Sequence, residues 1–81
     1  MKAFVYVTLK KSVLDPQGKT IQGALKKLGY NSVSDVRQGK YFELEIAGTD
    51  PQQAKGQVEK IAREVLTNPV IEEFHYTLEG A

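Results

Sequence analysis

The chain has 81 residues, a formal net charge of +1 and no cysteine. Its length predicts a single domain over residues 1–81, and a domain this small buries only roughly 60% of the surface of its unfolded chain, so association with other subunits would stabilise it. The charge by itself indicates no polyanionic partner. The lack of cysteine excludes disulfides, thiolate catalysis and a cysteine zinc site. No apolar run suits a signal peptide or a membrane span, so we expect a cytoplasmic protein.

The first predicted element is a strand over residues 3–10, which is rich in β-branched and aromatic residues. Alternation places Ala3, Val5, Val7 and Leu9 on one face and Phe4, Tyr6, Thr8 and Lys10 on the other. Because both faces are partly apolar, the pattern indicates a central strand.

A short turn over residues 13–18 ends this strand and begins a helix. Asp15 is a suitable N-cap, Pro16 fits the first helical position, and Gly18 is expected to leave the backbone uncovered on the first turn. We interpret the turn as a docking surface, in which Val13 and Leu14 either pin it to the core or offer an apolar contact to a partner.

The helix that follows is predicted from an apolar stripe that recurs at helical spacing. Gly29 supplies a left-handed stop after it. The stripe consists of Ile21, Ala24, Leu25 and Leu28.

The second half of the chain repeats this pattern of elements. Residues 31–39 are expected to form a weak strand, paired in a hairpin with a half-buried strand over residues 41–46. Asp50 and Pro51 then predict a second helix start. That helix is expected to end at residues 68–69, before a last strand over residues 70–78. Its apolar stripe consists of Ala54, Val58, Ile61, Ala62, Val65 and Leu66.

The predicted order is β-α-β-β-α-β, and Asp-Pro-Gln recurs at residues 15–17 and 50–52. This order is typical of the α+β, ferredoxin-like two-layer sandwich, an antiparallel sheet with two helices on one face. The other face is then bare. Phe4, Tyr6 and Tyr41 should lie on it, so we expect this face to pack against another sheet or another subunit, and our hypothesis is a homodimer formed through the sheets.

The sequence contains no predicted catalytic constellation. Residues 18–20 imitate the end of a phosphate-binding loop, but Val13 stands where the first glycine of that motif is required. His75 is the only histidine and has no cysteine or second histidine with which to bind a metal. Glu43 and Glu45 share a strand face, where solvation explains them more simply than catalysis.

Three kinds of binding function remain open. A single-stranded RNA-binding module would use Tyr6 and Tyr41, but Lys40 stands where that motif needs an aromatic residue, and glutamates flank the rings. A regulatory domain that binds an amino acid rests on fold analogy alone. A subunit interface is favoured. Two cations and a glycine at the expected hairpin tip are further candidates for contact with a partner, namely Arg37, Gly39 and Lys40.

Five segments spread over the chain are characteristic when taken together. They are Val-Tyr-Val-Thr-Leu-Lys at 5–10, Ser-Val-Leu-Asp-Pro-Gln-Gly at 12–18, Leu-Gly-Tyr at 28–30, Asp-Val-Arg-Gln-Gly-Lys-Tyr at 35–41 and Asn-Pro-Val-Ile-Glu at 68–72. With these segments the chain resembles the PurS family, the small subunit of phosphoribosylformylglycinamidine synthase in purine biosynthesis. The resemblance covers nearly the whole chain.

The resemblance implies a bridging role and no active site. The chain would join a glutaminase subunit (PurQ) to an ATP-dependent synthetase subunit (PurL) and assist ammonia transfer between them, since a dry path keeps ammonia from protonation and dilution. The complex would use ATP, Mg and glutamine, with no cofactor, metal or nucleic acid on this chain, which would be a dimer or a tetramer when free. Expected partner contacts are Val13, Leu14, Asp15, Gln17, Gly18, Arg37, Gly39 and Lys40.

Overall fold

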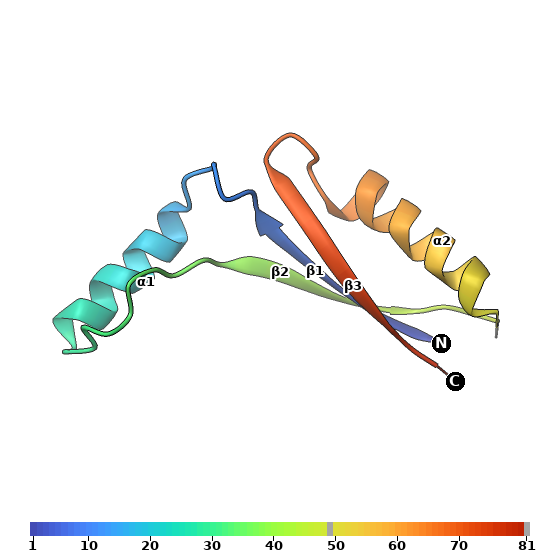
Figure 1. Cartoon of the computed structure of the whole chain (residues 1–81), viewed down its shortest axis with the longest axis horizontal. Coiled ribbons are helices and arrows are strands. Elements are labelled where there is room, and N and C mark those ends of the chain that lie inside the picture. The colour runs from blue at the N-terminus through green and yellow to red at the C-terminus, as the bar shows by residue number, and fades with distance from the viewer. Residues whose placement is uncertain (49, 81) are drawn as a thin grey trace.

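The computed structural model describes residues 1–48 and 50–80. The elements are β1 (Lys2–Leu9), α1 (Pro16–Lys27), β2 (Gly39–Glu45), α2 (Pro51–Ile61), the π-helix η1 (Ala62–Leu66) and β3 (Glu72–Glu79) (Figure 1). The α+β class, the antiparallel sheet and the two helices agree with the sequence. The strand expected over residues 31–39 does not form as expected. Only Gly39 is in a strand, at the start of β2, so the sheet has three strands in the order β2-β1-β3.

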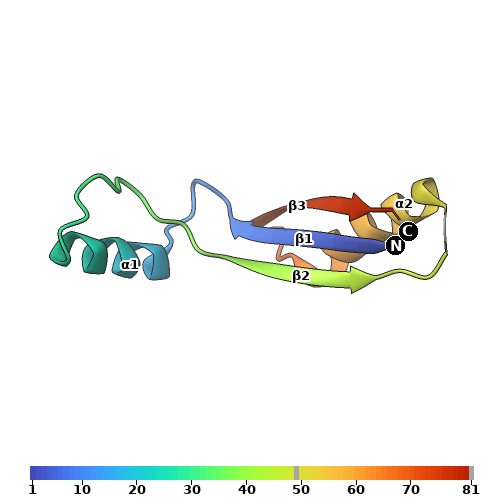
Figure 2. The ribbon, with the colours of Figure 1, turned by 90° about the horizontal axis from the view of Figure 1, so that it is seen from below.

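The sheet is antiparallel throughout, with β1 in the centre as the sequence predicts (Figure 2). Tyr6 lies opposite Tyr41 on β2 and opposite His75 on β3. Because side chains alternate along a strand, this register puts all three of these side chains on one face of the sheet.

The core forms where α2 packs on the other face of the sheet. Tyr76 of β3 also donates a hydrogen bond from its hydroxyl to Oε1 of Glu59 on α2, at 2.7 Å. The fully buried members of the core cluster are Ala3, Val5, Val7, Val58 and Ala62, and the half-buried side chains packed against them are Phe42, Leu44, Ile46, Leu66, Phe74, Tyr76 and Leu78.

One residue of the predicted stripe of the second helix does not reach the core. Val65 is 73% exposed, whereas Val58 and Ala62 are fully buried. Val65 lies in η1, where π-helical winding places more residues in a turn than an α-helix does. Val65 therefore points away from the sheet, whereas Leu66, the next residue, packs against the core.

The first helix lies beyond the end of the sheet and not on its face, so of the two helices expected on one face only α2 lies there in this chain. Two extended segments connect α1 to β1 and β2 (Figures 1 and 2). The molecule measures 49 × 27 × 14 Å, with a radius of gyration of 16.1 Å. A compact domain of this length would have a radius of gyration of about 12 Å. We call residues 10–38, which contain α1, the arm.

The ends of the helices follow the predicted chemistry. The Asp15 carboxylate caps α1 and the Asp50 carboxylate caps α2. At the end of α1, Gly29 has a φ of 95°, and its N–H donates to the carbonyl of Lys26 at 3.1 Å. The N–H of Tyr30 donates to the carbonyl of Leu25 at 2.9 Å. This pair of bonds is a Schellman motif and confirms the predicted stop. Among the described residues, no helix has the length and apolar character needed to cross a membrane.

Candidate interaction surfaces

Four rings form a continuous row on the sheet face opposite α2, which we call the aromatic face: Phe4, Tyr6, Tyr41 and His75. Tyr41 stacks on Phe4 with ring centroids 6.1 Å apart and lies 5.2 Å from Tyr6. His75 stacks on the other side of Tyr6 at 4.8 Å, with 17° between the ring planes. The prediction that the first three rings share the bare face is confirmed.

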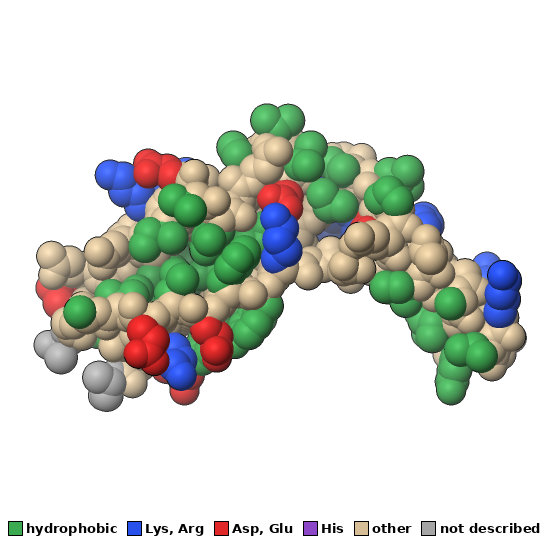
Figure 3. Space-filling view, turned by 180° about the vertical axis from the view of Figure 1, so that it is seen from behind, with side chains coloured by type: hydrophobic (Ala, Val, Ile, Leu, Met, Phe, Trp, Pro, Cys, Tyr) green, Lys and Arg blue, Asp and Glu red, His purple; other side chains and the backbone are tan. Residues whose placement is uncertain are grey.

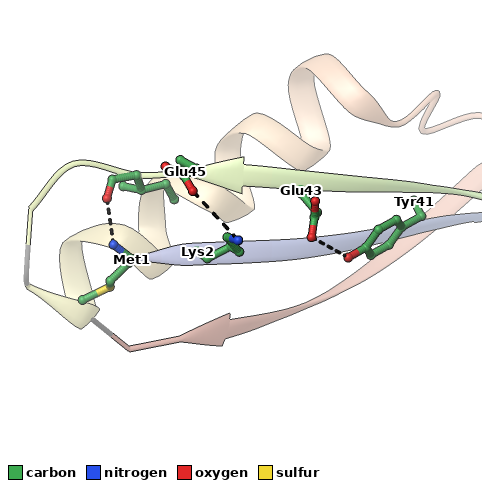
Figure 4. A network of polar contacts seen from close by, with 6 residues as sticks. Met1, Lys2, Tyr41, Glu43 and Glu45 are labelled. Carbon is green, nitrogen blue, oxygen red and sulfur yellow. Dashed lines mark hydrogen bonds and ion pairs between the residues drawn. The ribbon is translucent and has the colours of Figure 1, made fainter.

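Carboxylates border the aromatic face on its β2 side (Figure 4). The Tyr41 hydroxyl donates to Oε1 of Glu43 at 3.2 Å, and burial together with the Glu43 charge raises the pKa of Tyr41. Lys2 pairs with Glu45 at 3.9 Å, and beside them the amino terminus donates to the carbonyl of Ile46 at 3.0 Å. Negative side chains next to the rings repel phosphates, which disfavours the RNA-binding alternative.

His75 is the member of the aromatic face that the sequence reasoning did not assign to it. Alternation correctly separates His75 from Phe74 and Tyr76, but alternation alone does not say which strand lies beside β1. The antiparallel register of β1 with β3 brings His75 opposite Tyr6. Strand pairing is a tertiary property, so this ring could be found only with the topology in hand.

The turn before α1 is built around a buried carboxylate. Asp15 is 4% exposed; its Oδ1 accepts from the N–H of Gly18 at 2.9 Å, and its Oδ2 accepts from the N–H of Gln38 at 2.8 Å. The hydrogen bonds from Gln38 and Gly18 lower the pKa of Asp15, with a smaller contribution from the Arg37 charge. Asp15 therefore ties together the two ends of the arm.

The expectation that Gly18 leaves an uncovered backbone is wrong. Gly18 is buried, and a Cβ added there would overlap the carbonyl oxygen of Val36. The backbone at Val36, in the segment that leads from α1 back to β2, covers the peptide that was expected to be exposed. Asp15 and Gly18 are thus internal contacts, and neither presents an accessible surface in this chain.

Arg37 is not at a hairpin tip, because residues 31–38 run on directly into β2. Its Nη2 donates to the carbonyls of Lys10 at 2.9 Å and Val13 at 3.1 Å. We call this set of contacts, made by Asp15, Gly18 and Arg37 with residues 9–13 and 36–38, the hinge. The hinge fixes the direction in which the arm leaves the sheet, and this explains why α1 does not lie on the sheet of its own chain.

Gly39 and Lys40 begin β2 beside the hinge. A Cβ on Gly39 would lie 2.7 Å from the carbonyl oxygen of Val7. Lys40 pairs with Glu72 at 3.1 Å. The pKa of Glu72 is lowered, first by the N–H of Asn68 and then by Lys40.

Several of the expected partner-contact residues meet in one place. A hollow of about 190 Å³ lies between the hinge and the end of the sheet. Leu14, which precedes Asp15 in the chain, is 68% exposed. The residues lining the hollow are Val7, Leu9, Asp15, Gln17, Gln38, Gly39, Lys40 and Glu72. Within residues 1–48 and 50–80, no group of three or more histidine, cysteine, aspartate or glutamate side chains is arranged to hold a metal ion.

The fold and these surfaces define a small α+β protein built for contact with other polypeptides. Its sequence matches the model of the family PurS: Phosphoribosylformylglycinamidine (FGAM) synthase over residues 2–80. The chain belongs to this family.

Relatives cover nearly all of the chain. The phosphoribosylformylglycinamidine synthase subunit PurS of Bacillus subtilis is 47% identical over 78 residues, which are 96% of this chain and 92% of the relative. That of Methanocaldococcus jannaschii is 40% identical over 78 residues, covering 96% of this chain and 94% of the relative.

Solved structures share the same fold. The C2 crystal form of B. subtilis PurS superposes with a TM-score of 0.84 at 46% identity, covering 96% of each chain. A chain of the structure of PurLQS from Thermotoga maritima superposes with a TM-score of 0.83 at 32% identity, covering 94% of each chain.

Proposed function

We propose that residues 1–81 act as one PurS-like domain that joins the glutaminase and synthetase subunits of phosphoribosylformylglycinamidine synthase and assists ammonia transfer between them. One observation carries the proposal: the fold matches, over almost its whole length, a chain of a T. maritima assembly named PurLQS. The surfaces described above support it, since they offer contact area to other subunits.

The reactants belong to the partner subunits in this proposal. The complex would use ATP, magnesium and glutamine, and this chain would bind none of them. Because ATP and glutamine are cytoplasmic metabolites, the proposal also places the protein in the cytoplasm.

Two surfaces serve this role in our proposal. The aromatic face packs against the same face of another copy, and this contact gives a homo-oligomer. The surface around the hollow, where exposed Gln17 and Lys40 meet, contacts the larger subunits together with exposed Leu14 of the same turn. Asp15, Gly18 and Arg37 support that surface from within, through the hinge.

The test compares synthesis of the amidine product by the glutaminase and synthetase subunits with and without this protein. Each mixture is supplied either with glutamine or with an ammonium salt. Glutamine-driven synthesis should require the protein, whereas ammonium-driven synthesis should proceed without it, because free ammonia needs no transfer between subunits. If neither rate responds to the protein, the proposed coupling role is wrong.

A matched pair of variants tests the contact surface in the same assay. Leu14→Ser removes an exposed apolar side chain from the turn that contributes Asp15 and Gln17 to the hollow, and Val65→Ser removes one that is similarly exposed on η1, which contributes no residue to its lining. Leu14→Ser should lower glutamine-driven synthesis and Val65→Ser should not. Equal effects of the two variants would contradict this placement of the surface.

A further inference from the structure

The arm carries more than half of the basic side chains of the protein. Residues 10–38 contain six basic side chains and two carboxylates, a net charge of +4, whereas the whole chain carries +1. Of the two carboxylates, Asp15 is buried in the hinge, and Oδ1 of Asp35 accepts from the N–H of Val36 at 2.9 Å. Figure 3 shows basic side chains, in blue, at the outer end of the arm, at the right of the view. The outer surface of the arm is therefore positive.

Three of these cations gather on the side of α1 that is opposite its apolar stripe. Residues three or four positions apart lie on one side of a helix, so Lys19, Lys26 and Lys27 surround Gly23. All four residues are exposed. Among the described residues, no carboxylate forms an ion pair with any of the three lysines. We call these four residues the lysine face.

The stability of α1 does not explain two members of the lysine face. Lys19 is the fourth residue of α1, where the positive end of the helix dipole disfavours a cation, and no acidic residue in the first turn offsets it. Gly23 lies in the helix interior, where glycine is less favourable than alanine. A Cβ on Gly23 would meet nothing within 4 Å, so packing inside the chain does not require a glycine there. Both residues suit a contact outside the chain.

An acidic polypeptide fits the lysine face better than a nucleic acid does. Carboxylates form charge-assisted hydrogen bonds with ammonium groups, and the bare backbone at Gly23 lets another backbone approach closely. Proteins that bind single-stranded nucleic acid combine cations with aromatic rings on which the bases stack. The rings of this chain lie instead on the aromatic face of the sheet, where Tyr41 donates to Glu43.

We propose that the lysine face docks an acidic surface of one of the larger subunits, whose backbone approaches α1 at Gly23. This inference rests on the proposed bridging function and adds the chemistry of one contact to it. Lys19 and Lys26 pair with carboxylates on either side of the approach. The hinge holds α1 away from the sheet of its own chain, which leaves this side of the helix accessible. The contact is separate from the apolar stripe, which lies on the other side of α1.

Zero-length crosslinking tests the contact directly. The complete complex of this protein with the glutaminase and synthetase subunits is treated with a carbodiimide, which joins a lysine amine to a carboxylate that touches it. Mass spectrometry should find Lys19 or Lys26 joined to an aspartate or glutamate of a larger subunit. Lys55 and Lys60, which are exposed on α2, should give no such product. Links from Lys19 and Lys26 only to another copy of this chain, or no links from them, would overturn the proposal.

A matched pair of double variants measures the same contact in the glutamine-coupling assay. Lys19→Gln with Lys26→Gln removes two charges from the lysine face, and Lys55→Gln with Lys60→Gln removes two exposed charges from α2. The first pair should raise the protein concentration that gives half-maximal glutamine-driven synthesis about tenfold, and the second should leave it unchanged. The difference should shrink when NaCl is raised from about 0.05 to about 0.5 M, because salt screens exposed charges.

The outcomes of this comparison separate the contact from the coupling role. If the unsubstituted protein stimulates glutamine-driven synthesis and the two double variants behave alike, the coupling role stands and the lysine face is not its contact. If the unsubstituted protein gives no stimulation, both proposals are wrong. If the lysine-face variant keeps full coupling and instead loses binding to poly(U), the occupant is a nucleic acid and the proposal is overturned.

Gly23→Ala distinguishes an effect on binding from an effect on folding. It should raise the melting temperature, because alanine favours the helix and the added methyl meets open space. It should nevertheless raise the half-saturating concentration at least about fivefold, because the methyl group overfills a close contact. Gly56→Ala, in α2, should raise the melting temperature and leave that concentration unchanged. A Gly23→Ala protein that couples as well as Gly56→Ala would show that no backbone approaches α1 at this position.

Discussion

The Asp15 carboxylate has two roles, because its two oxygens accept from N–H groups at opposite ends of the arm. Oδ1 accepts from Gly18 and Oδ2 accepts from Gln38. The sequence correctly predicts the first task, capping α1. The second, the hydrogen bond from Gln38, joins residues 23 positions apart and leaves no local pattern. A helix cap thereby becomes the anchor of the hinge.

The two aspartate caps should therefore respond differently to the same substitution. Asp15→Asn replaces one acceptor oxygen with an NH₂ group that faces a backbone N–H, so it should lower the melting temperature at neutral pH. Asp50→Asn should have little effect, because the Asp50 carboxylate, within the described residues, accepts from the N–H of Gln52 through Oδ1 and from no distant segment, and an asparagine caps equally well. Thermal denaturation monitored by circular dichroism measures both. Equal melting temperatures for the two variants would contradict the double role of Asp15.

Acid should weaken the hinge for the same reason. The folded state lowers the pKa of Asp15, so its stabilising contribution is complete above the unfolded value of about 4 and is lost as the pH falls through the folded pKa. We expect the melting temperature of the unsubstituted protein to fall more steeply below about pH 4 than that of Asp15→Asn, which has no carboxylate to protonate at this position. Parallel pH profiles for the two proteins would argue against a stabilising charge at Asp15.

At the scale of elements, local chemistry explains where the helices begin and end. Both helices start at an Asp-Pro pair, and α1 stops at a glycine with a positive φ. The sequence predicts a weak strand over residues 31–39, of which only Gly39 lies in a strand. The backbones of Val36 and Gln38 pack on the hinge, and among the described residues no strand pairs with them.

Two glycine substitutions should change stability in opposite directions. Gly29→Ala places a Cβ at a φ of 95° and should cost about 1 kcal/mol. Gly56→Ala lies inside α2 with open space around the added methyl, and should stabilise the protein by roughly 0.5–1 kcal/mol. Urea denaturation of both variants gives the comparison. A Gly29→Ala variant as stable as the unsubstituted protein would mean that the Schellman motif is not maintained in solution.

For the whole molecule, association between copies of the chain decides which of its surfaces remain exposed to water. If the aromatic face is a contact between copies, Tyr6→Ala should weaken that association by on the order of 2 kcal/mol, because an aromatic ring at the centre of an interface contributes strongly to binding. Lys60→Ala, on the exposed surface of α2, is the control. Light scattering over a dilution series distinguishes the oligomers. A Tyr6→Ala protein that associates like the control would show that the aromatic face is not an interface between copies.

The sequence by itself determined the α+β class, the central position of β1, the caps of both helices and the shared face of Phe4, Tyr6 and Tyr41. These features depend on interactions within a few residues, or on the alternation of side chains along one strand. The tertiary structure alone decided that the arm extends, that Asp15 and Gly18 are internal and that His75 joins the aromatic face. An extended arm and a folded-back arm have the same helix, the same caps and the same apolar stripe. What separates them is the hydrogen bonding of Asp15 and Arg37 to distant backbone, which short-range sequence patterns do not encode.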